Sequence, residues 1–277
     1  RGMVRRGSVV FISGEPPLSN VYPKKFLDQF NYIVSSHKNI KHPNNVLHQQ
    51  GLNWHYRNSY PEEQSGIQFF KTMEVPKKTK NISVITSRKN KLPGQKKRLD
   101  LLQHLHTSFS QDIDMYGKGV KMLDDKAEGL DPYRFHICIE NAFIDDYWSE
   151  KFADPILAYS IPIYIGCRNI TDYFPEKGYF NFNIDDTLGI TEKVSEILQK
   201  PEVVYDKMLD ELRKMRNRIL DDYNLFPEIV RCFGDIMDKK SSTPVDISLH
   251  PIGDFLSYKL ELLQMRMKRY YLRCTTK

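Results

Sequence analysis

The chain has 277 residues, of which 40% are hydrophobic and 27% are charged, and its formal net charge is +6. These totals are ordinary for a soluble globular protein of one large or two ordinary domains, and no run approaches the ~18 apolar residues of a membrane span. The four cysteines are widely spaced and none has CxxC spacing. They predict reduced thiols in a cytosolic protein and argue against a zinc site.

The positive charge is concentrated in two segments. Residues 71–98 contain ten lysines and arginines but only one acid, and residues 239–277 contain eight against three acids. Such segregation indicates a negatively charged partner, and by itself it leaves open a nucleotide, a nucleic acid or a lipid surface.

The predicted elements alternate along the chain. Apolar runs bounded by turn residues predict strands at residues 9–14, 30–36, 81–87, 112–117, 133–141, 161–166 and 179–184. Apolar residues at helical spacing predict helices at residues 96–109, 154–160, 191–200, 203–226 and 255–273. The basic, proline-containing stretch 61–81 predicts a linker. The alternation predicts an α/β fold with a Rossmann-type sheet.

Two of these helices raise specific expectations. The helix at residues 154–160 should begin at Asp154 as its N-cap, with Pro155 in the first helical position. The helix in the tail interleaves apolar and basic residues. A packed terminal helix is the plainer interpretation, and a helix that binds a membrane surface or a partner is the alternative.

A dense group of polar side chains follows the strand expected at residues 133–141. The stretch "IENAFIDDYWSEK" places Asn141, Tyr147, Glu150 and Lys151 after the carboxyl end of that strand, where α/β proteins bind ligands. A phosphate there would meet Lys151 and the backbone donors of a helix start, and Glu150 could accept hydrogen bonds from sugar hydroxyls. A loop that only caps the helix is the alternative, but the density of polar groups favours a ligand site.

Three other positions are candidates for chemistry. Arg98 lies at the start of a helix, after the strand that ends at Ser87. The neighbouring lysines, considered individually, are interpreted as a solvated basic loop. Glu15, in the proline-held loop "SGEPP", is a candidate general base, with a surface glutamate as the plainer interpretation. Asp112 and Asp114 could hold a divalent metal, but a structural role is favoured.

Residues 133–166, "YRFHICIENAFIDDYWSEKFADPILAYSIPIYIG", resemble the signature of the alpha-1,3-fucosyltransferase family. In that family a YKF strand leads to FEN, then to a DY-(V/I)-TEK element and an A-G-x-(V/I)-P-(V/I)-x-x-G segment. Weaker similarity covers residues 9–186. The resemblance implies a GT-B fold, with two Rossmann-like domains and a cleft between them. Its parts are expected to be an acceptor-side domain at residues 1–75, a donor-binding domain at 76–238 and a basic helical tail at 239–277.

The same resemblance implies roles for residues. The family's donor contacts fall on Ser87, Arg98, Asn141, Tyr147, Glu150 and Lys151, and Glu15 corresponds to its general base. The implied reaction moves fucose from GDP-fucose to a hydroxyl of a glycan or lipid-linked glycan, with inversion and without a cofactor or a metal. The implied setting is surface polysaccharide synthesis in a bacterial-type member. Residues 112–117 fall on the family's D-x-Y-G strand, which favours the structural role of the two aspartates.

Several positions depart from the family pattern. Trp148 replaces the usual Val or Ile, the loop before Arg98 is longer, and the amino-terminal domain is short, as if its first strand were missing. Two alternatives therefore stay open: another nucleotide sugar on the same scaffold, and a non-catalytic basic adaptor for anionic partners. No stacking motif indicates nucleic acid. We expect a cytoplasmic protein whose basic tail contacts the cytoplasmic face of a membrane.

Overall fold

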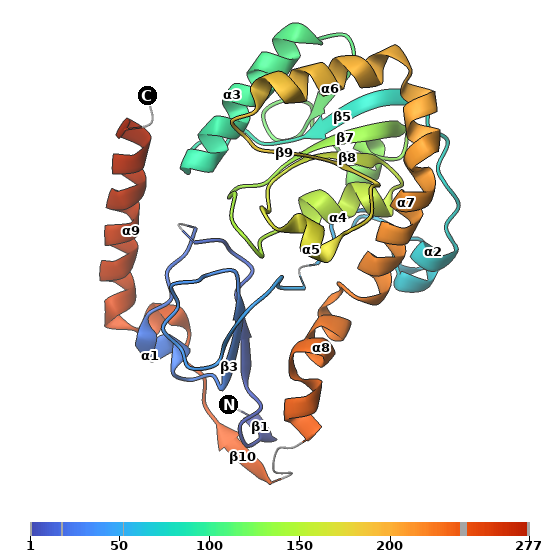
Figure 1. The fold of residues 1–277 in the computed structure, drawn as a ribbon. Coiled ribbons are helices and arrows are strands. Elements are labelled where there is room, and N and C mark those ends of the chain that lie inside the picture. The colour runs from blue at the N-terminus through green and yellow to red at the C-terminus, as the bar shows by residue number, and fades with distance from the viewer. Residues whose placement is uncertain (1, 18, 52, 239–242, 276–277) are drawn as a thin grey trace. The chain divides into compact units, whose positions relative to one another are not determined.

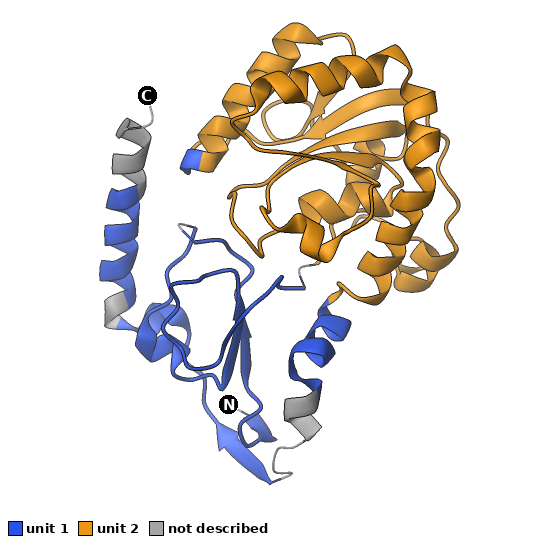
Figure 2. Cartoon of the chain, viewed as in Figure 1, with its two compact units in different colours: residues 1–51, 91–93, 225–277 blue, residues 52–90, 94–224 orange. Residues whose placement is uncertain are grey.

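The computed structural model describes residues 2–17, 19–51, 53–238 and 243–275. It divides into two compact units (Figure 2). Unit 1 comprises residues 1–51, 91–93 and 225–277, and unit 2 comprises residues 52–90 and 94–224. The chain therefore begins in unit 1, builds most of unit 2, and returns to unit 1 for its final segment.

Unit 2 is built around a sheet of five parallel strands. Their spatial order is β6–β5–β7–β8–β9. The strands are β5 (Lys80–Ile85), β6 (Ile113–Tyr116), β7 (Tyr133–Ile139), β8 (Ile161–Ile165) and β9 (Phe180–Phe182). Numbered within the unit, this is the doubly wound order 2-1-3-4-5, in which the direction of winding reverses between the first and third strands. Here these strands are β5 and β7, so their carboxyl ends mark the expected ligand position.

Helices cover both faces of this sheet (Figure 1). α4 (Glu150–Leu157) and α7 (Pro201–Asp221) pack on β7 and β8, whereas α3 (Pro93–Ser108) and α6 (Thr187–Gln199) lie beside each other, joined by a hydrogen bond between His104 and Thr191. The central strands β7 and β8 are almost fully buried between these layers, as their mostly apolar sequences require. The remaining short elements of unit 2 are η1 (Glu62–Gln64), α2 (Ile67–Thr72), η2 (Lys126–Gly129) and α5 (Ile170–Tyr173).

Unit 1 contains a smaller parallel sheet, β2–β3–β4, and an antiparallel pair, β1–β10. Its elements are β1 (Gly2–Arg5), β2 (Val10–Ile12), α1 (Lys24–Leu27), β3 (Tyr32–Ser35), β4 (Asn45–Leu47), α8 (Leu225–Asp238), β10 (Pro244–Ile247), η3 (Ile252–Asp254) and α9 (Leu256–Thr275). Phe26, Leu27 and Ile33 form its small core, together with aromatic residues of the loops and Phe255. The predicted α/β fold with parallel sheets is confirmed.

The division of the chain differs from the predicted boundaries at residues 75 and 238. The expected linker at 61–81 contains η1, α2 and the start of β5, and Tyr56 and Phe70 are buried in the core of unit 2. These two aromatic rings stack with their centroids 5.7 Å apart. At the other end, α8 and the tail belong to unit 1. Local composition could not show either assignment, because both depend on contacts between distant segments.

The predicted cap at Asp154 is wrong. α4 begins at Glu150, and its N-cap is Ser149, whose hydroxyl accepts a hydrogen bond from the Lys151 amide; Pro155 lies inside the helix. The Asp154 carboxylate instead accepts hydrogen bonds from the backbone amides of His55 and Tyr56, at 2.9 and 3.2 Å. This buried carboxylate therefore anchors a distant segment, which the local Asp-Pro pattern does not reveal.

The Tyr164→Phe variant should lower the free energy of unfolding by about 1–3 kcal/mol, because it leaves a buried donor without a partner. Tyr164 is fully buried in β8, and its hydroxyl oxygen accepts a hydrogen bond of 2.8 Å from the Cys167 amide. Urea unfolding of both proteins measures the difference. An unchanged unfolding midpoint would contradict the role assigned to this hydroxyl.

Among the described residues, no helix has both the length and the apolar character needed to span a bilayer.

Candidate functional site

The loops after β5 and β7 meet at the point where the sheet reverses its winding. Arg98, on α3, donates a hydrogen bond of 2.8 Å from Nη1 to Oδ1 of Asn141, which follows β7. Its Nη2 donates to the carbonyl oxygen of Ser87 at 3.0 Å. α3 approaches the second loop closely, since a Cβ at Gly94 would lie 2.5 Å from the Asn141 carbonyl oxygen. The structure thus brings together three of the predicted donor-binding residues.

The Arg98 guanidinium is placed in an unusual environment for a cation. The residue is only 5% exposed, and its Nε is buried without a hydrogen-bond partner among the described residues. Burial lowers the pKa of Arg98, and the Glu140 carboxylate opposes that shift. A buried charged donor without a partner is costly, so an anionic oxygen in this position would be stabilised.

A second charged group surrounds the start of α4. Glu140, which is completely buried, accepts hydrogen bonds of 2.8 Å from the amide and the hydroxyl of Ser149. The Lys151 ammonium lies 2.9 Å from Oε1 of Glu150 and 3.6 Å from Oε2 of Glu140. Ser149 therefore connects the helix cap to the buried carboxylate, and Lys151 lies between two acids.

The charges in this group depend on one another. Burial raises the pKa of Glu140, with Lys151 acting in the opposite direction. Burial would also raise the pKa of Glu150, but Lys151 and Lys126 outweigh it and lower that pKa to about 2. The two carboxylates raise the pKa of Lys151 despite its burial, and Arg98 acts against them. Lys151 is therefore a permanent cation within electrostatic range of Arg98.

A small cavity lies beside these residues. Its polar lining comes from Lys126, His136, Glu150, Lys151 and Asp154, and its walls include residues of β7. The Lys126 ammonium lies 2.5 Å from Asp154. Neither Glu140 nor Lys126 was predicted to be a site residue. Glu140 could have been found as the acid of the "EN" pair that ends β7, whereas Lys126 has no local signal.

The other predicted site residues occupy different environments. Tyr147 is 3% exposed. Ser87 contributes its backbone carbonyl oxygen, which accepts a hydrogen bond from Arg98. Glu15 lies in unit 1, in the loop after β2, where its side chain is exposed and its carbonyl oxygen is 2.7 Å from Nε2 of His37. The donor contact of Tyr147 and the role of Glu15 as a base stay predictions.

Two further positions have a structural explanation. Trp148, which departs from the family pattern, is buried and packs edge-to-face on Phe152, Phe174 and Tyr223, with ring centroids 5.2–6.1 Å apart. Asp114 accepts hydrogen bonds from Lys80 at 2.8 Å and from Tyr133 at 2.5 Å. These contacts agree with the structural role that was favoured for Asp114.

His136 should make stability depend on pH. Burial lowers its pKa to about 3, with Lys126 contributing, and its Nδ1 lies 2.8 Å from the Ser83 hydroxyl. The unfolded chain takes up a proton near pH 6.5 and the folded chain does not, so the unfolding free energy falls as the pH drops from about 6.5 towards 3. We expect roughly 1 kcal/mol less stability at pH 5 than at pH 6 from this residue. Urea unfolding of wild type and His136→Asn at both pH values should show a shallower dependence in the variant; equal slopes would contradict the assignment.

Comparison with known proteins agrees with this geometry. Residues 75–207 match the model of glycosyltransferase family 10 (fucosyltransferase), C-terminal region. A fucosyltransferase-like protein of Arabidopsis thaliana is 37% identical over 71 residues, which are 24% of this chain and 14% of that protein. The GDP-fucose protein O-fucosyltransferase 3 of Homo sapiens is 34% identical over 76 residues, 27% of this chain and 14% of that protein. Each match thus spans about one seventh of the relative's length.

The fold is similar to that of a solved enzyme. The crystal structure of an alpha1,3-fucosyltransferase has a TM-score of 0.52 to this chain at 18% identity, over 86% of this chain and 77% of that one. At this identity the similarity shows the fold, and the predicted GT-B class is confirmed. The site described above lies within the residues matched by the family model, at the reversal of the larger sheet.

Proposed function

We propose that this chain, whose residues 75–207 match the model of glycosyltransferase family 10 (fucosyltransferase), transfers fucose from GDP-fucose to a hydroxyl of an acceptor. The donor assignment is supported by the family and by the name of the human relative, which is a GDP-fucose protein O-fucosyltransferase. The observation in this chain that best supports the donor assignment is the hydrogen bond between Arg98 and Asn141, at the point between β5 and β7 where the winding of the sheet reverses. The Nε of Arg98 beside it has no hydrogen-bond partner among the described residues.

The mechanism follows from the charges at this site. Breaking the sugar–phosphate bond leaves positive charge on the sugar and negative charge on the departing diphosphate. Arg98 and Lys151 would stabilise the diphosphate, and an anion would also relieve the repulsion between these two cations. Glu150, which stays ionised because of the neighbouring ammonium groups, would accept hydrogen bonds from hydroxyls of the nucleotide sugar.

The acceptor hydroxyl has to lose a proton as it attacks. We assign this step to Glu15, whose exposed carboxylate lies in a proline-held loop of unit 1. Attack from the face opposite the departing diphosphate inverts the anomeric carbon. These residues supply a base and two cations, and the proposed reaction uses no cofactor.

Two classes of acceptor follow from different observations. A glycan hydroxyl, as in a surface polysaccharide or a lipid-linked precursor, is supported by the resemblance of residues 133–166 to the alpha-1,3-fucosyltransferase signature. A protein hydroxyl is supported by the name of the human relative. We favour the glycan acceptor, because the resemblance to the alpha-1,3-fucosyltransferase signature covers the whole segment from β7 to β8.

An activity assay tests the proposal. Purified protein is incubated with GDP-fucose, GDP-mannose or UDP-galactose and with panels of oligosaccharide and protein acceptors, and nucleotide release and acceptor mass are followed. The proposal expects acceptor-dependent release of GDP from GDP-fucose alone, and a fucosylated oligosaccharide. Transfer of a sugar from another donor would be consistent with the fold and the mechanism but would rule out fucose as the sugar transferred. Fucosylation of a protein instead of an oligosaccharide would identify the second class of acceptor.

We also propose a cytoplasmic location with peripheral membrane contact through α9. Leu260, Leu263 and Met267, spaced for one helix face, are 60%, 54% and 64% exposed, and Lys259 and Lys268 are exposed near them. An apolar stripe beside cations suits an anionic bilayer surface. Sedimentation with phosphatidylglycerol vesicles should pull down wild type but not a variant with glutamine at the three apolar positions. Equal binding of both proteins, or none, would reject the proposal.

A further inference from the structure

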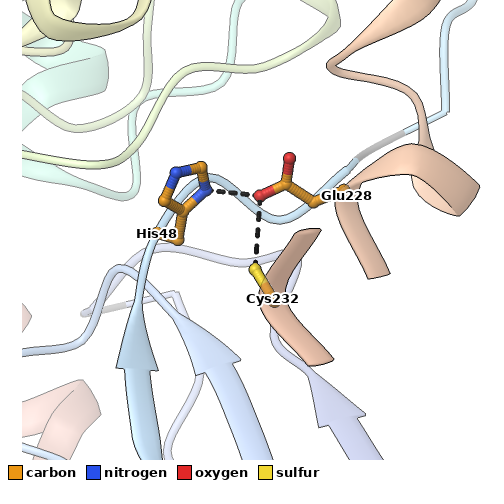
Figure 3. A group of neighbouring side chains, drawn as sticks. All are labelled: His48, Glu228 and Cys232. Atoms are coloured by element: carbon orange, nitrogen blue, oxygen red, sulfur yellow. Dashed lines mark hydrogen bonds and ion pairs between the residues drawn. The ribbon is translucent and has the colours of Figure 1, made fainter. Parts of the chain in front are cut away.

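We propose that His48, Glu228 and Cys232 form a Zn²⁺ site in unit 1, separate from the donor site of unit 2 (Figure 3). One ligand atom from each residue, the imidazole nitrogen, a carboxylate oxygen and the thiol sulfur, lies within 4.8 Å of the others. Among the residues that the structure describes, no other group of three such side chains meets this criterion.

The ligands come from two segments that are far apart in the sequence. His48 directly follows β4, whereas Glu228 and Cys232 are four residues apart on α8 and therefore share one face of that helix. Figure 3 shows the imidazole of His48 pointing at one oxygen of the Glu228 carboxylate, with the Cys232 sulfur pointing at the same oxygen. Nδ1 of His48 forms an ion pair with Oε1 of Glu228, and the Cys232 sulfur lies 3.8 Å from that oxygen. All three ligand atoms thus converge without any change of backbone.

The central carboxylate is held in place by its surroundings. Glu228 is 2% exposed, and its second oxygen, Oε2, pairs with the Arg231 guanidinium. Arg231 thus binds one oxygen while the other faces His48 and Cys232, which is the arrangement expected of a residue that orients a metal ligand. Nδ1 of His48 also lies 3.3 Å from the carbonyl oxygen of Gln49, a contact that metal binding would replace.

The chemistry of the ligand set indicates zinc. A thiolate and an imidazole are preferred by Zn²⁺ and poorly suited to Mg²⁺ or Ca²⁺, which take oxygen ligands. Tetrahedral coordination at typical zinc distances places neighbouring ligand atoms about 3.4–3.6 Å apart. The three ligand atoms lie within 4.8 Å of one another, so side-chain rotations would bring them to this range, and a water molecule would complete the four ligands.

The place of this site in the chain gives it a structural role. His48 precedes by three residues the point where the chain leaves unit 1, and Glu228 follows by three residues the point where it returns. These segments pack closely, since a Cβ at Gly51 would lie 3.0 Å from the Leu225 Cα and 3.4 Å from the Glu228 Cβ. Zinc would cross-link the amino-terminal sheet of unit 1 to α8. The wide spacing of the three residues explains why the cysteine pattern predicted no zinc site.

Cobalt substitution tests the ligands directly. The full chain is freed of metal with a chelator, kept reduced, and titrated with Co²⁺ and then Zn²⁺, while circular dichroism monitors folding. We expect binding of one Co²⁺ per chain with a sulfur-to-cobalt charge-transfer band, displacement by Zn²⁺, and a rise of several degrees in Tm with Zn²⁺. The band should disappear in Cys232→Ser, and affinity should fall at least tenfold in His48→Gln and Glu228→Gln.

A second cysteine supplies the matched control. Cys274→Ser also removes one thiol and should keep the charge-transfer band and the affinity of the wild type. Absence of metal binding by the folded protein would overturn the proposal and leave the cluster as an ion pair. Binding that survives in Cys232→Ser, or that is lost in Cys274→Ser, would overturn it as well. None of these readouts depends on GDP-fucose, so a failure of the proposed activity would be recognised separately.

Discussion

Arg98→Lys should lower kcat/KM for transfer from GDP-fucose by about 10²–10³-fold while the protein remains folded. A guanidinium can contact Asn141 and the Ser87 carbonyl oxygen with its terminal nitrogens and still offer Nε to a phosphate. A lysine has one nitrogen in place of three, so the variant cannot hold the two loops and bind the diphosphate together. Steady-state kinetics with varied GDP-fucose measures the loss.

A matched arginine shows whether the loss of activity is specific to Arg98 or follows from any replacement of arginine by lysine. Arg213, on α7, is half exposed and pairs with Asp210 at 2.8 Å on the helix surface. Arg213→Lys should therefore leave kcat/KM within about twofold of wild type, since exposed ion pairs contribute little. Wild-type kinetics in Arg98→Lys would show that Arg98 has only a structural role and would remove one of the two cations from the mechanism.

Lys151→Met should weaken both GDP binding and folding. The variant leaves Glu140 buried without its cation, which typically costs about 3–5 kcal/mol of stability, and it removes one of the two charges that would face the diphosphate. We expect at least a tenfold weaker affinity for GDP and a lower Tm. Calorimetric titration with GDP and thermal unfolding measure the two effects.

A double variant distinguishes donor binding from loss of structure. Lys151→Met combined with Glu140→Gln removes the uncompensated carboxylate, so it should recover much of the stability but not the affinity for GDP. Lys214→Met is the matched control, because Lys214 is exposed and pairs with Glu211 on the surface of α7. If the double variant regained GDP affinity together with stability, Lys151 would be a structural residue rather than a donor contact.

The sequence predicted the parts of the fold that local patterns determine. The buried strands β7 and β8 are mostly apolar runs bounded by turn residues, and the long helices repeat apolar residues at helical spacing. Elements that depend on distant partners were missed. β1 pairs with β10 across almost the whole chain, and α2 lies in the segment that was expected to be a linker. The return of α8 to unit 1 has no local signal either.

The same distinction applies to the site. The sequence identified Asn141, Glu150 and Lys151 as candidates because polar residues after a buried parallel strand mark a ligand position, and the family motif contains them; their contacts with a donor stay predictions. The hydrogen bond between Arg98 on α3 and Asn141 after β7 joins residues 43 positions apart, so spacing could not predict it. At Asp154 a local pattern gave a wrong prediction. The Asp-Pro sequence predicted a helix N-cap, but the Asp154 carboxylate accepts hydrogen bonds from backbone amides of a segment about a hundred residues earlier in the chain.

The central claim is that the charged residues after β5 and β7 hold a nucleotide diphosphate. Calorimetric titration of the wild-type chain with GDP and with UDP, beside Arg98→Lys and Arg213→Lys, tests it most directly. We expect one GDP site per chain, little or no binding of UDP, and a loss of GDP affinity in Arg98→Lys alone. Tighter binding of UDP than of GDP, or GDP binding that is equal in all three folded proteins, would contradict it.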